Sequence, residues 1–451
     1  MKPLRWIPSL AAVWIATVAT QLTFAAPPIA PKHAAEDRYW GVPVTDDYRW
    51  LENWSDPEVK SWVDSQNAWT RGALDHLPAR PEILKRVESL SRSLTPRYFG
   101  LDCKKGVIFA LKDQPPKNQA MLVRLDSPND LSTERMLVDP NTLDATGSTT
   151  VDFYVPSLDG SKVAVSLSKG GTESGDIHIY DTRTGQELPD VIPHVNGGTA
   201  GGSVAWNKDG TALWYTRYPA AGERPEADRD FYQQLWYHTL GQPLSSDQYV
   251  VGKEFPKIAE IAVETADDGE HVLIEVKNGD GGEIAYLLRE PGGQIVPVAG
   301  FKERVKGAAF TPDGLFLLSR KTNANGEVLR VPFENPVLSK AKSVVPASET
   351  AIDEIHVAGS RLYVVDIVGG PSEVRMFTLA GAPLGKLPLA PVSSLSGFTK
   401  LSGDAVPTRI ARMRSNSPAN SRKIPNATEI TVSVFPGYTI MRTPTPRDAR
   451  P

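Results

Sequence analysis

Short runs of alternating apolar and polar residues fill the chain from about Tyr98 to Val406. Residues 162–167 and 271–276 show the period of two that is expected of half-buried strands. Turn pairs that tolerate a positive φ precede five such runs, at 159–160, 209–210, 268–269, 313–314 and 359–360. Turns at such regular intervals indicate a repeat of roughly 40–50 residues with four strands, which is typical of a β-propeller blade.

The third strand of each repeat is also visible in the sequence. It is predicted at Asp176–Tyr180, Gln234–Thr239, Glu283–Arg289, Glu327–Pro332 and Glu373–Leu379. Counting from Tyr98 gives six nearly complete units and the beginning of a seventh at Val392. A stacked αβ repeat would need helical patterns of about 10–15 residues between the strands, and none is present. We therefore predict a mainly β chain, a truncated seven-bladed β-propeller at 93–406 with an incomplete seventh blade, preceded by a short helical arm.

Residues 27–92 have the helical pattern that predicts this arm. Ser55-Asp56-Pro57-Glu58 fits a capping box, with Pro57 in the first turn, where its missing N–H costs nothing. A first helix then carries its apolar residues at three- and four-residue steps, and a second helix is predicted to start at Pro81. The members of these faces are Val59, Trp62, Val63, Gln66 and Trp69, then Ile83, Leu84, Val87 and Leu90. Such faces need a large partner to cover them.

Five tryptophans of the arm admit two interpretations. Trp40, Trp50, Trp54, Trp62 and Trp69 could form a carbohydrate-binding platform. An aromatic helix interface explains them more simply, and we favour it.

The N-terminal segment 1–26 has the layout of a secretory signal peptide. Lys2 and Arg5 precede an apolar run from Trp6 to Val18, and small residues follow at 23–26. The run falls short of the roughly 20 apolar residues that a transmembrane anchor needs. We expect a secreted protein, with the periplasm as its destination, and no membrane partner.

Charge and cysteine content exclude several classes of partner and site. The net charge of −4 gives no reason to expect nucleic acid as a partner. Cys103 is the only cysteine, so an intramolecular disulfide and a cysteine-based metal site are both excluded, and we expect it to be half-buried. No zinc-protease, Walker or EF-hand motif is present. The sequence predicts no cofactor and no metal.

Residues 407–451 differ in composition from the rest of the chain. This tail holds eight Lys and Arg residues, two acidic residues and seven prolines. The repeat breaks at Pro407, where the seventh unit should turn into its second strand. A basic disordered arm is one explanation. A slipped reading frame is the other, and a break inside a unit favours it.

Several segments resemble the prolyl oligopeptidase family of serine peptidases. They are Asp47–Glu52, Trp62-Val63 and Gln66-Asn67 in the arm, and Trp206–Gly210 and Phe231–Gly241 in the repeats. The resemblance runs from about Pro27 to Val406. It implies an N-terminal arm and a seven-bladed propeller that lies over an α/β-hydrolase domain with a Ser-Asp-His triad. It also implies that the propeller limits access to short peptides, which are cut after proline. The arm would then contact the hydrolase domain, which is missing from this chain.

The chemistry of such peptidases needs a G-x-S-x-G elbow followed by Asp and His. Gly171–Gly175 places serine fourth rather than third, and Gly201–Ala205 lacks the closing glycine. The last histidine is His356, within the sixth unit. The others are His33, His76, His178, His194, His238 and His271, scattered over the arm and the repeats. The sequence therefore predicts no catalytic residue in this chain.

We expect an inactive N-terminal and propeller portion of a prolyl oligopeptidase-like peptidase, with short peptides and the hydrolase domain as partners. The alternative is a stand-alone secreted propeller that binds peptides. A third possibility is that a separate chain supplies the catalytic part.

Overall fold

The computed structural model describes residues 26–91, 96–127, 130–197, 200–389, 392, 394–399, 410–414, 432–435 and 438–441. The chain divides into two compact units, residues 1–93 and residues 94–451. The predicted signal peptide lies outside the described residues, apart from Ala26.

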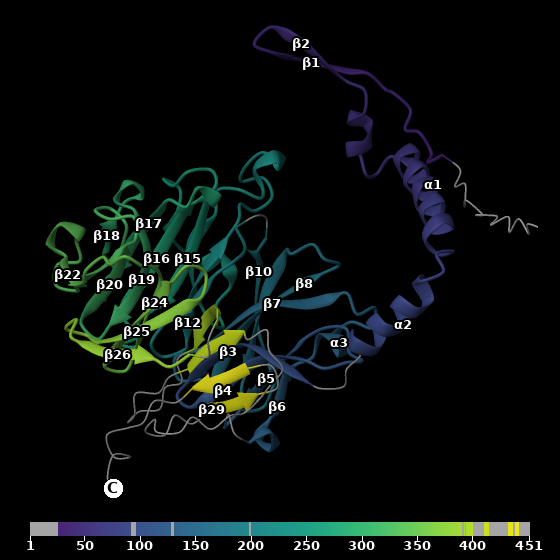
Figure 1. The fold of residues 1–451 in the computed structure, drawn as a ribbon. Helices are drawn as coiled ribbons and strands as arrows, with labels where there is room; N and C mark the ends of the chain where they lie inside the picture. The colour runs from purple at the N-terminus through teal and green to yellow at the C-terminus, as the bar shows by residue number, and fades with distance from the viewer. Residues whose placement is uncertain are drawn as a thin grey trace, which may run out of the picture. The chain divides into compact units, whose positions relative to one another are not determined.

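The first unit contains a β-hairpin as well as helices (Figure 1). Its elements are β1 (Ala35–Tyr39), β2 (Val42–Asp46), the 3-10 helix η1 (Arg49–Glu52), α1 (Pro57–Leu74) and α2 (Arg80–Ser91). The prediction of two helices is confirmed. The prediction that the whole arm is helical is wrong for residues 35–46, where Trp40 and Gly41 both have positive φ and turn the chain between antiparallel strands.

α1 begins as expected but with a different capping residue. The carboxylate of Asp56 accepts a hydrogen bond from the Glu58 N–H at 2.8 Å, and Pro57 is the first helical residue. Ser55 instead donates to the side chain of Asn53 at 2.7 Å. The cap is therefore Asp56, one position after the predicted Ser55.

The tryptophans do not form one helix interface, which corrects that interpretation. Only Trp62 and Trp69 lie on α1. Trp50 is in η1, while Trp40 in the hairpin turn and Trp54 before α1 are 100% and 66% exposed.

The second unit is a β-propeller with six four-stranded antiparallel sheets, each made of consecutive strands, so the predicted fold is confirmed. The first three sheets are β3 (Arg97–Lys104), β4 (Val107–Asp113), β5 (Met121–Leu125) and β6 (Arg135–Val138); β7 (Thr149–Pro156), β8 (Lys162–Lys169), β9 (Gly175–Asp181) and β10 (Glu187–Asn196); and β11 (Val204–Trp206), β12 (Ala212–Arg217), β13 (Gln234–Thr239) and β14 (Gln248–Val251). The next three are β15 (Ala259–Thr265), β16 (Val272–Asn278), β17 (Ile284–Arg289) and β18 (Ile295–Ala299); β19 (Val305–Thr311), β20 (Gly314–Ser319), β21 (Glu327–Pro332) and β22 (Lys342–Val345); and β23 (Ala351–Ala358), β24 (Arg361–Ile367), β25 (Ser372–Thr378) and β26 (Pro383–Leu387). Short helices in the connections are η2 (Leu131–Thr133), α3 (Pro140–Leu143), η3 (Glu226–Asp228), η4 (Leu244–Ser246), η5 (Gly279–Gly281), η6 (Phe301–Glu303) and η7 (Leu338–Lys340).

A seventh sheet begins after β26. β27 (Ser394–Thr399) pairs with β28 (Ile410–Arg414), and β29 (Val432–Phe435) pairs with β30 (Tyr438–Met441), which lies beside β28. β27 also lies beside β25 and β3, so the last sheet reaches the first. The prediction that the repeat stops at Pro407 without a second strand is wrong, because β28 pairs with β27. The rest of the tail lies outside the described residues.

Four of the five predicted turns use glycine in the left-handed region. Gly160, Gly210, Gly269 and Gly359 have φ between +56° and +75°. Gly314 differs, because it is the first residue of β20 and its φ is not positive. A Cβ on Gly314 would lie 2.2 Å from the carbonyl oxygen of Val331. This glycine is required by a close backbone approach and not by its φ.

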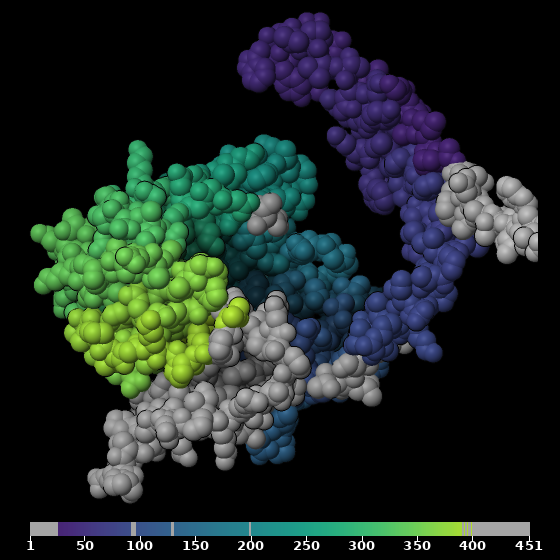
Figure 2. Space-filling view, in the orientation of Figure 1, coloured from purple at the N-terminus to yellow at the C-terminus, as the bar shows by residue number. Residues whose placement is uncertain are grey.

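The hydrophobic core lies between neighbouring sheets. Figure 2 shows that the colours of the second unit follow one another in chain order over this face, from blue through teal and green to yellow-green. Ile177 and Ile179 of the second sheet pack with Trp206 and Leu213 of the third. The Trp206 indole N–H donates to the carbonyl oxygen of Val155 at 2.9 Å. Cys103, expected to be half-buried, is 5% exposed in the core of the first sheet.

Candidate functional site

The two serines weighed as nucleophiles belong to connections between strands. Ser174 lies between β8 and β9, and its N–H donates to the Thr172 hydroxyl at 3.3 Å. Ser203 lies between β10 and β11, and its hydroxyl accepts from the Val263 N–H of the fourth sheet at 3.0 Å. Both serines therefore make hydrogen bonds within the propeller.

Histidine rings in the described part of the chain face carboxylates or the backbone in six of seven cases. Five histidine rings contact acidic side chains. The pairs are His33 with Glu58, His178 with Glu187, His238 with Asp247 and Asp190, His271 with Asp268, and His356 with Glu354. The sixth, His76, lies 2.7 Å from the Gly72 carbonyl oxygen. His194 is the exception, since its Nδ1 atom is buried without a hydrogen-bond partner among the described residues.

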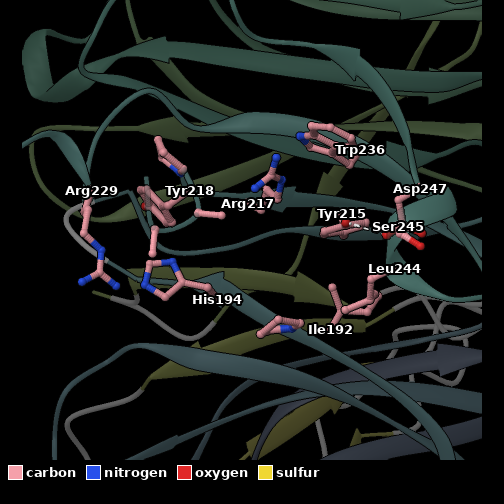
Figure 3. Close-up of a pocket in the computed structure, with 14 residues that line it drawn as sticks. Ile192, His194, Tyr215, Arg217, Tyr218, Arg229, Trp236, Leu244, Ser245 and Asp247 are labelled. Carbon is pink, nitrogen blue, oxygen red and sulfur yellow. Dashed lines mark hydrogen bonds between the residues drawn. The ribbon is translucent and has the colours of Figure 1, made fainter. Parts of the chain in front are cut away.

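A pocket of about 490 Å³ lies between the second and third sheets, and His194 lines it. β10 supplies Ile192, Pro193 and His194, and β12 with the loop after it supplies Tyr215, Arg217 and residues 218–221. The lining is completed by Arg229, Trp236, Leu244, Ser245 and Asp247. Figure 3 shows Arg229 and His194 at one end, and Leu244, Ser245 and Asp247 at the other.

One loop of unusual length shapes this pocket. The connection from β12 to β13 spans residues 218–233, whereas the corresponding loops of the other five sheets have seven residues or fewer. The sequence gave one indication of this long loop. The interval between the turns at 209–210 and 268–269 is the longest of the four intervals between predicted turns. The spacing of the turns did not indicate which side chains line the pocket, because they come together only when the second and third sheets pack.

Arg217 is held in place within the pocket wall. Its guanidinium donates to both carboxylate oxygens of Glu223, at 2.9 and 3.2 Å, and lies 4.3 Å from the centre of the Trp236 ring. The Arg217 hydrogen bonds are the largest cause of the lowered pKa of Glu223. The charge of Arg217 is therefore largely balanced within the protein.

A buried polar network lies at the opposite end. The Tyr215 hydroxyl donates to Asp247 at 2.7 Å, and burial together with this bond raises the pKa of Tyr215. The other oxygen of Asp247 lies 2.7 Å from Nδ1 of His238, whose Nε2 lies 3.3 Å from Asp190. Asp190 belongs to the second sheet and His238 to the third. The network therefore ties the two sheets together.

The arm unit exposes apolar side chains along α2. Ile83, Leu84, Val87 and Leu90 are between 43% and 60% exposed. Val59 is the only buried residue of α1, and α2 has none among its described positions. The expected apolar face therefore exists and is uncovered within its own unit.

No group of three or more His, Cys, Asp or Glu residues in the described ranges is arranged to hold a metal ion. Among the helices that the structure describes, none is both long and apolar enough to span a bilayer.

A family model described as the N-terminal β-propeller domain of prolyl oligopeptidase matches residues 27–406. This chain belongs to the prolyl oligopeptidase family. The match covers the arm, all six complete sheets and the start of the seventh. The resemblance read from the arm and the repeats is thereby confirmed.

Known family members are similar along most of the chain. A prolyl endopeptidase of Elizabethkingia meningoseptica is 25% identical over 377 residues, which are 82% of this chain and 52% of that enzyme. Protease 2 of Moraxella lacunata is 22% identical over 77% of this chain and 49% of its own length. The chain thus spans about half the length of these relatives.

Solved structures show the same fold. A prolyl endopeptidase structure superposes with a TM-score of 0.77 at 23% identity, over 86% of this chain and 56% of that one. Prolyl oligopeptidase B from Galerina marginata, bound to a 25-residue macrocyclization substrate, gives 0.72 at 17% identity over 86% of this chain and 57% of its own.

Proposed function

We propose that this chain provides the arm and propeller of a peptidase that admits short peptides and cuts them after proline. The bond-breaking chemistry would belong to an α/β-hydrolase domain, and this chain would not hydrolyse peptides by itself. The observation that carries the proposal is the uncovered apolar face of α2, in a chain whose residues 27–406 match the family's propeller. Secretion directed by residues 1–26 is part of the proposal, and N-terminal sequencing of exported protein tests it.

The face of α2 has the properties of one half of an interface. An exposed cluster of large apolar side chains on a protein surface commonly marks a contact with another domain or protein. Covering it would gain roughly 25 cal/mol for each Å² of apolar area removed from water. In the proposed assembly the hydrolase domain covers this face.

Inactivity is tested with the purified full chain. A chromogenic Gly-Pro anilide and a fluorophosphonate probe should give no product and no labelled serine. Product formation that co-purifies with the chain, together with one labelled serine, would overturn this part of the proposal.

Docking is tested with the separately produced catalytic segment of the Elizabethkingia meningoseptica relative. The full chain should retain it on an affinity column, and the double variant Leu84→Ser/Val87→Ser should retain at least about tenfold less, as expected when two interface anchors are lost. The control is Leu143→Ser, because Leu143 is 53% exposed and lies outside the arm. Equal retention by both variants would show that α2 is not the docking face.

A stand-alone peptide-binding propeller is the second candidate, and the pocket between the second and third sheets favours it. Tight peptide binding by the chain, with no retention of any catalytic segment, would support this alternative.

A further inference from the structure

We propose that the pocket between the second and third sheets binds a short peptide through a carboxylate group. The inference does not depend on the proposed peptidase role, because binding is measured on the chain itself.

The cationic end of the pocket has one guanidinium that the protein leaves largely available. Glu223 balances Arg217, whereas the ion-pair partner of Arg229 among the described residues is Glu226, whose side chain is 82% exposed and lies 2.8 Å from one terminal nitrogen. An ion pair this exposed is weak. Asp230 adds a smaller electrostatic attraction. The Nε atom of Arg229 is buried with no acceptor in the described part of the chain. An anionic ligand would supply a second partner for this side chain.

His194 stands beside Arg229 in a conformation that needs support. Its φ is +60°, which is uncommon for a residue other than glycine, and its N–H is held by Asp176 at 2.9 Å. The ring meets the edge of Tyr218 with centroids 5.8 Å apart. Strained backbone and unpaired buried polar atoms are both features that occur at ligand sites. The imidazole of His194 lies at the same end of the pocket as Arg229 (Figure 3).

Two acidic groups of the pocket region, Asp247 and Glu223, already have partners. Asp247 receives the Tyr215 hydroxyl and faces His238, and its side chain is only 2% exposed. Glu223 receives Arg217 and also the Ala220 N–H at 3.0 Å. Because these two carboxylates are already satisfied by protein donors, a ligand carboxylate would be an additional partner for Arg229 and His194, in a place where the charges of Asp230 and Glu260 also act on Tyr218.

The remaining walls suit the body of a peptide better than a bare inorganic anion. Tyr215, Tyr218 and Trp236 give aromatic surface, and Ile192 and Leu244 give aliphatic surface. The volume of about 490 Å³ falls within the range of about 300–1,000 Å³ that is usual for organic ligands. A carboxylate at the Arg229 end would leave the side chains of the peptide along these walls.

The carboxylate could be the C-terminus of a peptide or an acidic side chain, and three probes separate the two sources. They are acetyl-Ala-Ala-Ala with a free carboxyl end, its C-terminal amide, and acetyl-Ala-Ala-Glu amide. Calorimetric titration of the full chain near neutral pH should show one site for at least one carboxylate probe. The neutral amide should bind at least about tenfold more weakly, because it lacks the charge-assisted hydrogen bonds.

Variants assign the binding to the pocket. Arg229→Gln removes the charge, and His194→Asn removes the imidazole while keeping a residue that tolerates positive φ. Each substitution should weaken the binding of the carboxylate probe by about tenfold or more. Arg135→Gln is the control, because Arg135 is an exposed arginine of the first sheet and its loss changes net charge equally. Melting temperatures of all three should match that of the parent chain within a few degrees, which keeps loss of binding distinct from loss of fold.

Three results would overturn the inference. They are equal binding of the acid and amide probes, no binding of either carboxylate probe, or the same affinity for Arg229→Gln as for Arg135→Gln. Loss of peptidase docking would not bear on it, since the titration uses neither the catalytic segment nor turnover.

Discussion

The Nδ1 atom of His238 lies 2.7 Å from a carboxylate oxygen of Asp247, and both side chains are only 2% exposed. The remaining ring nitrogen faces Asp190 across the boundary between two sheets. Polar groups at this depth stabilise a fold only while every partner is present, because each is costly to leave unpaired in a medium of low polarity.

Replacing Asp247 by alanine should therefore be strongly destabilising. The substitution leaves Nδ1 of His238 and the Tyr215 hydroxyl without their acceptor, and breaking a buried pair of this kind costs about 3–5 kcal/mol. Urea unfolding measures the loss. Glu187→Ala is the control, because its pair with His178 has the same 2.7 Å separation but side chains 24% and 40% exposed, and it should cost less than about 1 kcal/mol. Equal losses of unfolding free energy in the two variants would show that burial does not determine how much such a pair contributes to stability.

The sixth sheet contains a second buried pair, between Asp366 and Arg375. Asp366 is fully buried and accepts two hydrogen bonds from the guanidinium, at 2.6 and 2.8 Å. Arg375→Gln should lower the free energy of unfolding by about 3–5 kcal/mol, and Arg375→Lys should restore only part, since an ammonium cannot reproduce the forked geometry.

The matched control for this pair is Arg330→Gln. Arg330 and Asp313 form an ion pair whose side chains are 37% and 59% exposed, so the change should cost less than about 1 kcal/mol. Full stability in Arg375→Lys would contradict the argument from geometry.

Gly314→Ala should destabilise the fifth sheet through a backbone clash. The added methyl group would meet the Val331 carbonyl oxygen at 2.2 Å, and forcing a strand apart costs about 1–3 kcal/mol or more. Gly292→Ala is the control, because it has open space and no positive φ, and it should be neutral or slightly stabilising. Thermal unfolding compares the two. A neutral Gly314→Ala would show that β20 and β21 separate freely.

Stability should fall as the pH drops below about 5, with Asp144 among the contributors. The hydroxyls of Ser148 and Thr146, with nearby backbone N–H groups, hold the pKa of Asp144 well below its usual range. A carboxylate with a lowered folded-state pKa contributes stability above its unfolded value of about 3.9, and that contribution is lost as pH falls through the folded value.

The test of this pH dependence is a series of unfolding midpoints between neutral and acidic pH. Asp144→Asn should flatten the acid side of the profile, while Asp353→Asn, on an exposed position of β23, should leave its slope unchanged. Parallel profiles for the parent chain and Asp144→Asn would refute the assignment.

Elements governed by local chemistry could be predicted from the sequence, and those governed by packing could not. The strand at Gln234–Thr239 and the turn at Gly160 follow from a period of two and from glycine's tolerance of positive φ. The hairpin was missed because the first of its two turn residues is Trp40, with a φ of +49° that is uncommon for a residue other than glycine, and Gly41 is the second. Asp56 displaced Ser55 as the cap because Pro57 occupies the first helical position.

The pocket could not be predicted because its residues converge only when two sheets pack. His194 and Arg229 are far apart in the sequence and belong to different repeats. The length of the loop between β12 and β13 was visible in the spacing of the predicted turns. Its path over the second sheet depends on tertiary contacts.

Each complete sheet of the propeller is built from one uninterrupted stretch of sequence. No early strand has to wait for a late one before its own sheet is paired. The chain can therefore acquire its fold progressively as it is synthesised, with every finished sheet offering a surface on which the next one condenses. Such a route keeps the entropic cost of each step close to that of a short hairpin, even though the six complete sheets together run from Arg97 to Leu387.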